Sequence, residues 1–514
     1  MSSTKGPLLI GVDLGTTAIK CAAYEEDGSP VGSATKEYML VTPAPAVVEV
    51  DASTYWSEFS CAMKDLLGQP EVDPGRVAAI GISAQGETLI PLRADGTPAR
   101  SAIVWLDGRA VEEAQELADR FDARQFYEVT GQPSMLPTWP AAKVLWLARH
   151  QPRTFELAAR FLLIEDYFLW RLTGEYVSEG SLLTSTCYWN FRTKRWWPEM
   201  LEAIGIDESR LPEVLEPGTA VGRLLPVVAQ ELGLPTSTKV CTGALDQACG
   251  AIGVGNVAPG CFSENTGAAV ALCATLDKAR LDPLRRMPCH YHGIPETYMF
   301  HTFTSGGVVL RWFRDSFAEA ERSVASSMGL DVYDLLAQEA ETIVAGAEGL
   351  VVIPHLQGAM APESNANARG AVVGLSLRHG RAHVARAILE SIAFVVRRNI
   401  EVLEDIDVVV PEIRALGGGA RSRTWKQIEA DVTKRPVLTS QQPEAATLGA
   451  AILAGLGLGI YTSAQEAARN MVQIKETFYP RAELAEGYDE MYAIYGRTYE
   501  ALCPVFDALG GLQP

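Results

Sequence analysis

One arrangement of strands and turns occurs twice along this chain, and that repetition limits the folds open to it. Residues 7–15, PLLIGVDLG, read as a strand that turns at Thr16-Thr17 into a second strand, residues 19–25. Residues 260–274, GCFSENTGAAVALCA, repeat this layout, with a turn at Thr266-Gly267 between two apolar strands. Because a strand pair must be covered by further elements, the duplicated layout predicts two α/β domains of similar topology.

Helices rich in small residues accompany both halves. Residues 239–255, KVCTGALDQACGAIGVG, read as a strand that runs into such a helix, and residues 444–459, EAATLGAAILAGLGLG, read as another. Residues 412–436 read as a strand, a triple-glycine turn and a helix. No linker is visible in the composition. We therefore expect two duplicated domains, residues 1–255 and 256–514, that pack around a cleft.

The first turn carries groups that suit a phosphate. A phosphate held between two strands needs glycine where the backbone comes close, and hydroxyl or N–H donors that face its oxygens. Thr16 and Thr17 offer hydroxyls, and the nearby carboxylate of Asp13 could hold a magnesium ion that bridges phosphates. A hairpin turn with a surface aspartate explains the same residues. The glycine spacing is not that of a dinucleotide-binding loop.

Asp246 stands at the end of an apolar strand, just before a helix. An aspartate in this place can accept the proton of an attacking hydroxyl. It can equally be the N-cap of the helix that follows, and the two roles are compatible. Later in the chain, Asn265-Thr266-Gly267 predicts a second phosphate turn, and residues 417–419, three glycines, would let a flat group such as adenine lie against the backbone. A tight strand-to-helix turn accounts for the glycines as well.

The charge balance excludes some partners. Lys and Arg number 44 against 63 Asp and Glu, which gives a net charge of −19. An acidic surface repels phosphate backbones, so we expect neither nucleic acid nor membrane as a partner. No stretch reaches the ~18 uninterrupted apolar residues of a membrane span. The first residues lack the cleavage site of a signal peptide, and we expect a cytoplasmic protein.

The order of these motifs resembles the actin-like ATPase superfamily, and within it the chain is similar to the FGGY carbohydrate kinases from about residue 8 to 490. The most specific match is Gly370–Glu390, where GAVVGL is followed after seven residues by HVARAILE, as in the second-domain signature of that family. Residues 143–150, KVLWLARH, match part of the first-domain signature. Thr138 departs from it, because an aromatic residue, Met, Gly or Ser is expected there.

Two further segments look like those of pentulose kinases. Residues 102–109, AIVWLDGR, are similar to a WxDxR segment, and residues 288–292, PCHYH, to a PxCHA-type strand. A small Cys/His metal cluster is the alternative interpretation of residues 288–292. A non-enzymatic actin-like ATP switch would lack both the WxDxR segment at residues 102–109 and the Gly370–Glu390 signature. A silent sugar sensor would have lost Asp13 or Asp246, and both are present.

The resemblance implies an α/β fold of two duplicated actin-like (ribonuclease H-like) domains. The first would bind the sugar and phosphates and carry the catalytic base, and the second would bind the adenosine. It implies an ATP-dependent kinase that phosphorylates a sugar hydroxyl, with ATP and Mg²⁺ as cofactors. The leading substrate is a ketopentose such as D-xylulose, and a polyol or a sugar acid such as gluconate is the alternative. A small sugar or polyol is then the partner, and a homodimer is left open.

The same resemblance implies residue roles, with Asp246 as general base and Asp13 as the magnesium residue. The other implied site residues are Thr16, Thr17, Thr266, Gly267 and Gly307 at the phosphates, Gly418, Gly419 and Ser422 at the adenosine, and Gln85, Glu87 and Trp105, with Asp246, at the sugar.

The segment Gln85-Gly86-Glu87-Thr88 follows neither the Gln-Met-His-Gly of xylulokinases nor the Gln-Arg-Glu-Thr of glycerol kinases. Gly86 is expected to leave room beside Glu87 and Trp105, unless another side chain fills that space. A carboxylate there accepts hydrogen bonds from hydroxyls and repels an anionic carboxyl, so neutral polyhydroxylated substrates are expected to be preferred over sugar acids.

Overall fold

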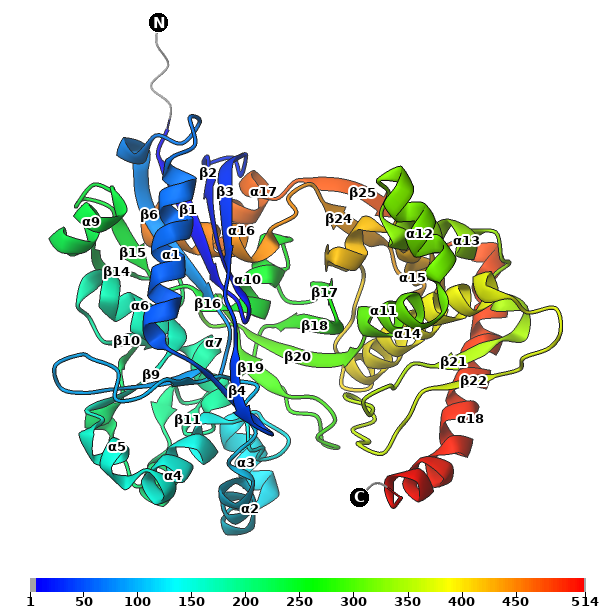
Figure 1. The fold of residues 1–514 in the computed structure, drawn as a ribbon, viewed down its shortest axis with the longest axis horizontal. Coiled ribbons are helices and arrows are strands. Elements are labelled where there is room, and N and C mark those ends of the chain that lie inside the picture. Colours follow the sequence, from blue (N-terminus) through cyan, green and yellow to red (C-terminus); the bar gives the residue numbers. More distant parts are fainter. Residues whose placement is uncertain (1–5, 513–514) are drawn as a thin grey trace, which may run out of the picture. The chain divides into compact units, whose positions relative to one another are not determined.

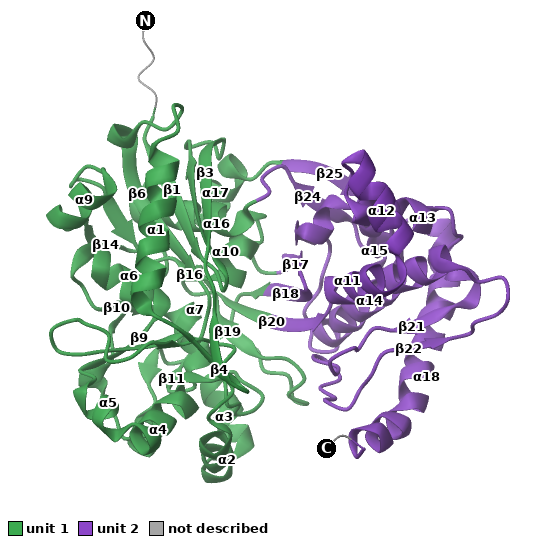
Figure 2. Ribbon diagram, in the orientation of Figure 1, with its two compact units in different colours: residues 1–259, 275–300, 444–473 green, residues 260–274, 301–443, 474–514 purple. Residues whose placement is uncertain are grey.

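The computed structural model describes residues 6–512 and divides into two compact units (Figures 1 and 2). Unit 1 comprises residues 1–259, 275–300 and 444–473, and unit 2 comprises residues 260–274, 301–443 and 474–514. The first change of unit, after residue 259, lies close to the domain boundary that we expect near residue 255. Two later segments, residues 275–300 and 444–473, also belong to unit 1.

A seven-stranded sheet forms the centre of unit 1. Its order is β14-β15-β6-β1-β2-β3, and β16 also pairs with β6. β1 is antiparallel to β2 and parallel to β6, which in turn is parallel to β15. The strands are β1 (Leu8–Leu14), β2 (Ala18–Tyr24), β3 (Pro30–Glu37), β6 (Val77–Ala84), β14 (Ala220–Arg223), β15 (Lys239–Cys241) and β16 (Ala244–Leu245).

Helices cover this sheet because its inner strands are apolar along nearly their whole length, as in strands buried on both faces. Helix α1 (Ala52–Leu67) packs on β2 and β3, and α16 (Ala445–Gly457) packs on β1 and β6. Helix α10 (Asp246–Gly253) packs along α16. The small residues expected in the last two helices are what allow this close packing.

A second layer of unit 1 carries a five-stranded sheet, order β4-β5-β8-β7-β9. Its strands and the helices around it share one apolar core that includes Leu89, Ile103 and Val144. The strands of this sheet are β4 (Val41–Ala44), β5 (Val47–Val50), β7 (Leu89–Leu92), β8 (Ala102–Ile103) and β9 (Arg160–Leu163).

The other α-helices of unit 1 are α2 (Val111–Arg120), α3 (Ala123–Thr130), α4 (Pro140–His150), α5 (Pro152–Leu157), α6 (Ile164–Thr173), α7 (Gly180–Leu183), α8 (Pro198–Ile204), α9 (Pro226–Leu232) and α17 (Ala464–Met471).

Unit 2 is built on strands that pair in the order β20-β18-β17-β23-β24-β25, which are part of a seven-stranded sheet. Its strands are β17 (Phe262–Thr266), β18 (Ala269–Leu276), β20 (Tyr298–Ser305), β23 (Ile413–Gly417), β24 (Val437–Ser440) and β25 (Ile474–Phe478). Its helices are α11 (Gly307–Phe317), α12 (Glu319–Met328), α13 (Val332–Glu341), α14 (Arg381–Glu404), α15 (Arg423–Thr433) and α18 (Ala485–Gly510), with the small hairpin β21 (Val351–Ile353) and β22 (Ala371–Val373).

The two main sheets repeat one topology. In unit 1 the central strand β1 has an antiparallel neighbour, β2, and a parallel one, β6. In unit 2, β17 has β18 and β23 in the same places, and both sheets end in an antiparallel edge strand, β14 or β25. The predicted duplication of an α/β fold is confirmed. In the described part of the chain, no helix is both long and apolar enough to cross a membrane.

We expect glycine at the α10–α16 contact to be required for stability. A Cβ at Gly449 would lie 1.9 Å from the carbonyl oxygen of Cys249, so Gly449→Ala must move one helix backbone. Overpacking of this kind costs about 1–3 kcal/mol in the free energy of unfolding. Gly496→Ala is the matched control, because a Cβ there, also inside a helix, meets nothing within 4 Å.

Denaturant unfolding measures both variants. Gly449→Ala should lower the unfolding midpoint, whereas Gly496→Ala should leave it unchanged or raise it, since alanine favours a helix by about 0.5–1 kcal/mol over glycine. Equal midpoints for the two variants would show that the helices tolerate a methyl group at their contact.

Candidate active site

Asp13 lies near the end of β1, the central strand of unit 1. Its Oδ1 accepts a hydrogen bond of 2.8 Å from the Ser83 hydroxyl at the end of the neighbouring β6. The side chain keeps part of its surface exposed, yet its surroundings are dry enough to raise the pKa of this carboxyl above its ordinary value. Lys20 partly offsets this effect, but its ammonium is paired with Glu444 at 2.7 Å. The carboxylate of Asp13 therefore lies where a cation would stabilise it.

The predicted phosphate turn and the predicted sugar residue Trp105 are in direct contact. Trp105 donates its indole Nε1–H to Thr16 Oγ1 at 2.8 Å, and its backbone N–H to Thr88 Oγ1 at 3.1 Å. Thr17 follows in the turn with an exposed side chain. The structure thus brings Thr16 and Trp105 together from segments about 90 residues apart in sequence.

Gln85 is almost fully buried and is directed toward the phosphate turn. Its Nε2 donates to the Gly15 carbonyl at 3.3 Å, and its backbone N–H donates to the Leu14 carbonyl at 3.1 Å. Tyr38 also donates its hydroxyl to the Gly15 carbonyl. In this position Gln85 supports the turn that holds Thr16.

Glu87 has a left-handed backbone, with φ of 54°, which is uncommon for a residue other than glycine. Its side chain is partly exposed, and desolvation raises the pKa of the carboxyl, while a hydrogen bond with Ser185 and the charge of Lys143 oppose that rise. The room that we expected beside Gly86 is absent in the direction that a side chain at position 86 would take. A Cβ at Gly86 would lie 3.0 Å from Leu245 Cδ1, so Leu245 fills that space and this prediction is wrong.

Asp246 is the first residue of α10, and Leu245 is the N-cap residue. The carboxylate therefore does not cap the helix as an N-cap aspartate would; it accepts a hydrogen bond of 2.6 Å from the neighbouring Gln247 N–H. Burial raises the pKa of Asp246 to about 8, and the negative charges of Asp13 and Glu87 add to that rise. Asp13, Glu87 and Asp246 thus form one group of electrostatically coupled carboxylates, each with some exposed surface.

In unit 2, the predicted phosphate residues gather at the ends of β17 and β23. Thr266 is paired in register with Gly417, and a Cβ at Gly419 would lie 2.5 Å from the Thr266 side chain. Gly307, the first residue of α11, donates its N–H to the Gly267 carbonyl at 3.0 Å. The predicted phosphate turn at residues 265–267 and the triple-glycine turn at residues 417–419 are therefore adjacent. A larger residue at position 419 would separate them.

The residues predicted for adenosine follow directly. Gly418 and Gly419 form a single 3₁₀ turn after β23, and Ser422 caps α15 by accepting the Trp425 N–H at 3.3 Å. Ser422 also lines a cavity of about 760 Å³, together with residues of α13, α15 and β25. This cavity has the size of a small-molecule site, and its lining is more polar than is usual for one.

A buried lysine stands behind the phosphate turn of unit 2. Lys426 Nζ donates to Glu264 Oε2 at 2.8 Å and reaches Thr266 Oγ1 at 3.4 Å, and it also bonds to Glu429. All three charged side chains are essentially unexposed. Sequence reasoning missed Lys426, because its spacing from Glu429 looks like an ordinary ion pair on a helix surface.

Sequence reasoning also missed Ser83 and Lys143. Ser83 could have been found as the one hydroxyl in the apolar strand VAAIGISAQ. Lys143 belongs to the segment that matches the family signature, and it is completely buried.

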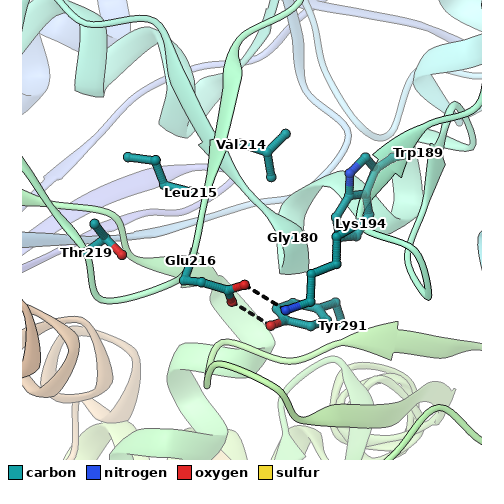
Figure 3. A pocket seen from close by; sticks show the side chains of 8 residues that line it. All are labelled: Gly180, Trp189, Lys194, Val214, Leu215, Glu216, Thr219 and Tyr291. Carbon is teal, nitrogen blue, oxygen red and sulfur yellow. Dashed lines mark hydrogen bonds and ion pairs between the residues drawn. The ribbon is translucent and has the colours of Figure 1, made fainter.

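A cavity of about 380 Å³ elsewhere in unit 1 shares no residue with the predicted site (Figure 3). Glu216 on its wall accepts hydrogen bonds from Lys194 Nζ at 2.7 Å and from the Tyr291 hydroxyl at 2.5 Å. Its charged groups thus bond to one another. Within residues 6–512, no three or more His, Cys, Asp or Glu side chains are arranged to hold a metal ion.

Comparison with known proteins identifies the family. Residues 8–253 match the N-terminal domain of the FGGY family of carbohydrate kinases, and residues 273–458 match its C-terminal domain. The chain belongs to the FGGY family of carbohydrate kinases. It is an enzyme, a sugar kinase that transfers a phosphoryl group to an alcohol, and the predicted resemblance is confirmed.

Several similar proteins carry different substrate names. The xylulose kinase of Bacillus subtilis (strain 168) is 29% identical over 492 residues, 96% of each chain. The structure of ligand-bound xylulose kinase from Lactobacillus acidophilus has a TM-score of 0.89 at 28% identity, and covers 98% of this chain and 100% of that one. The structure of gluconate kinase from the same organism has the same TM-score and identity, with 98% and 99% covered.

The raised pKa of Asp246 predicts a pH-dependent stability. The folded protein holds a proton on Asp246 up to about pH 8, whereas the unfolded chain releases it near pH 4. The bound proton therefore stabilises the folded protein fully below about pH 4, and this stabilisation is lost as pH rises through 8. An asparagine side chain in its place cannot ionise. In Asp246→Asn, the Tm advantage over wild type should therefore grow from about pH 6 to about pH 9.

Thermal melts of the ligand-free protein at the two pH values measure this difference. Asp51→Asn serves as control: hydrogen bonds from Ser53 lower the pKa of Asp51, which is then ionised in both folded and unfolded states over this range. Its Tm difference from wild type should not change with pH. An equally constant difference for Asp246→Asn would contradict the raised pKa.

Proposed function

We propose that this sugar kinase uses Mg²⁺ and ATP to phosphorylate a ketopentose such as D-xylulose, with Asp246 as the general base. The observation that carries the proposal is the position of Asp246: it begins α10, keeps exposed surface, and its pKa is raised to about 8 beside Asp13 and Glu87. In its ionised form, a carboxylate with so high a pKa is a stronger base than an ordinary aspartate.

In the proposed reaction, the sugar hydroxyl lies against Asp246 and attacks the γ-phosphorus of ATP. The bond between the sugar oxygen and phosphorus forms as the bond from phosphorus to the β,γ-bridging oxygen breaks, and ADP leaves. The hydroxyl proton passes to Asp246. Most of the rate enhancement in such a transfer comes from positioning and from electrostatic stabilisation, and proton removal adds to it.

The turn at Thr16 and Thr17 binds phosphate oxygens in this proposal, and Asp13 is the residue that would hold Mg²⁺. Burial raises the pKa of Asp13, and Lys20 is already paired with Glu444, so a bound cation would stabilise the ionised form of this carboxyl. A single protein carboxylate is sufficient, since magnesium is usually held by one or two carboxylates, by water and by the phosphates themselves. When bound, the ion offsets the negative charge of the phosphates.

In unit 2, the proposed nucleotide residues are Thr266, Gly267 and Gly307 for the phosphates and Gly418, Gly419 and Ser422 for the adenosine. Their support is that Gly307 bonds to Gly267 and that Gly419 lies against the side chain of Thr266, which brings the three segments that carry these residues together. The cavity beside Ser422 supports an adenosine site there.

The proposed sugar residues are Glu87, Trp105 and Asp246, with Gln85 behind them. Carboxyl groups line this part of unit 1, and the negative charges of Asp13 and Glu87 already raise the pKa of Asp246, so neutral hydroxyl groups are favoured here over an anionic carboxyl. The relatives named xylulose kinase agree with this preference. The equal similarity to a gluconate kinase makes gluconate the competitor to be tested.

The base is tested by Asp246→Asn, which keeps the size of the side chain and removes its basicity. We expect kcat to fall by roughly 10²–10⁴, with the KM for ATP and for sugar nearly unchanged. Steady-state kinetics by coupled ADP release measure this, and Asp51→Asn, at the start of α1, is the matched control with normal kcat. Near-normal turnover by purified Asp246→Asn would remove Asp246 from the role of base.

The substrate is tested by the same assay over D-xylulose, other ketopentoses, glycerol, erythritol and gluconate. We expect a ketopentose to have the highest kcat/KM. Glu87→Gln should lower kcat/KM for that sugar by about tenfold, because a hydrogen bond to a charged group is lost. It should also narrow the preference over gluconate, since the repulsive charge is gone.

Glu58→Gln, a change on the outer side of α1, controls for general effects and should alter neither value. If wild-type protein turned over gluconate faster than every neutral sugar, the ketopentose proposal would be wrong while the sugar-kinase activity stood.

A further inference from the structure

Lys143 is a buried cation whose hydrogen bonds all go to loop carbonyls. It lies on α4, and its Nζ donates to the carbonyl oxygen of Glu87 at 3.1 Å and to that of Val104 at 2.9 Å. Its side chain has no exposed surface. The two carbonyls belong to different loops, one after β6 and one after β8, and each loop carries one of the proposed sugar residues, Glu87 or Trp105.

The first of these loops is strained. Glu87 has a φ of 54°, and the Thr88 N–H donates to the Gly86 carbonyl at 2.7 Å across this single residue. A non-glycine residue in such a conformation persists only when its surroundings hold it there. The bond from Lys143 to the Glu87 carbonyl acts on the strained residue itself.

The second loop is held by hydrogen bonds to a buried carboxylate and can serve as the anchor. Asp107 is completely buried and accepts the Val48 N–H at 2.6 Å and the Arg109 Nε–H at 2.8 Å. Arg109 also donates to Glu49 at 2.6 Å. Asp107 and Arg109 hold the loop that contains Val104. The hydrogen bond to the Val104 carbonyl therefore holds the Lys143 side chain in place, and Lys143 in turn restrains the backbone of Glu87.

The charges around Lys143 suit this task. Burial lowers its pKa to about 7, while the carboxylates of Glu87 and Asp107 attract its ammonium and Arg109 repels it. An amine and an ammonium both have at least two N–H donors, so both carbonyls stay bonded in either form. A fully buried lysine is costly for a fold unless its hydrogen bonds are satisfied, and these two bonds satisfy both N–H donors of the amine and two of the three donors of the ammonium.

We propose that Lys143 is a positioning residue for the sugar site, which holds Glu87 in its left-handed conformation and ties it to the loop of Trp105. The inference rests on the proposed role of Glu87 in sugar binding and deepens it. Lys143 touches no proposed phosphate or adenosine residue in these hydrogen bonds. Its loss should therefore affect the sugar far more than the nucleotide.

Lys143→Met removes both donors and keeps the length of the side chain. We expect the KM for the sugar to rise about tenfold or more, as when a bond that orients a charged group is lost, while the KM for ATP stays within about twofold. Lys194→Met is the matched control from the same unit, because Lys194 bonds to Glu216 and to no proposed site residue. It should leave both KM values within about twofold.

A double-mutant cycle separates positioning from general loss of structure. Glu87→Gly removes the carboxylate and accepts a positive φ without strain. If Lys143 acts by orienting Glu87, Lys143→Met should raise the KM for the sugar by less than about twofold when Glu87→Gly is already present. An equal rise in both backgrounds, or equal rises in the KM for sugar and ATP, would overturn the inference.

Lys143→Gln is measured in the same cycle and decides the matter if Lys143→Met does not fold. Its amide keeps N–H donors with a shorter reach, so a partial rise in the sugar KM that disappears in Glu87→Gly supports positioning. A rise that persists there contradicts it. The wild-type substrate panel is run first, and the cycle uses the sugar turned over best, so a wrong substrate and a wrong role for Lys143 give different results.

Discussion

Close contact between α16 and the main sheet of unit 1 determines where the site can form. At Gly11 on β1, a Cβ would lie 1.7 Å from the Thr447 carbonyl oxygen, and at Gly81 on β6 it would lie 2.1 Å from that of Ala450. Backbone therefore lies directly on backbone, which only glycine permits. These strands lead into Asp13 and Gln85, and α10, packed on α16 in the same way, begins with Asp246.

This packing explains the unusual electrostatics of the site. Because helices cover the sheet so closely, the carboxylates at the strand ends lie in dry surroundings, and burial is the largest cause of the raised pKa at Asp13, Glu87 and Asp246. The same packing brings their charges close enough to add to one another at Asp246. A kinase benefits from both effects, since one buried carboxylate can hold a cation while another accepts a proton.

The duplicated fold and the residues at strand ends could be predicted from sequence, because the glycines, threonines and aspartates of the turns occur in a fixed order along apolar strands. The contact of Trp105 with Thr16 could not, because it depends on how two distant segments pack. The space beside Gly86 was predicted wrongly for the same reason: Leu245, about 160 residues later in sequence, fills it. Gln85 likewise proved to be directed toward the phosphate turn, which strand periodicity does not indicate.

Each unit has a buried lysine beside a segment that we propose for ligand binding, and the two lysines differ in what they hold. Lys426 bonds to two carboxylates, Glu264 and Glu429, so its ammonium is charge-compensated and ties β17 to α15. Lys143 bonds instead to two neutral carbonyls, with carboxylates only nearby, and burial lowers its pKa to about 7. A paired ammonium holds two elements together whatever the ligand does. A lysine bonded to carbonyls of two loops constrains the loop backbones directly, and in unit 1 those backbones carry the side chains that we propose for the sugar.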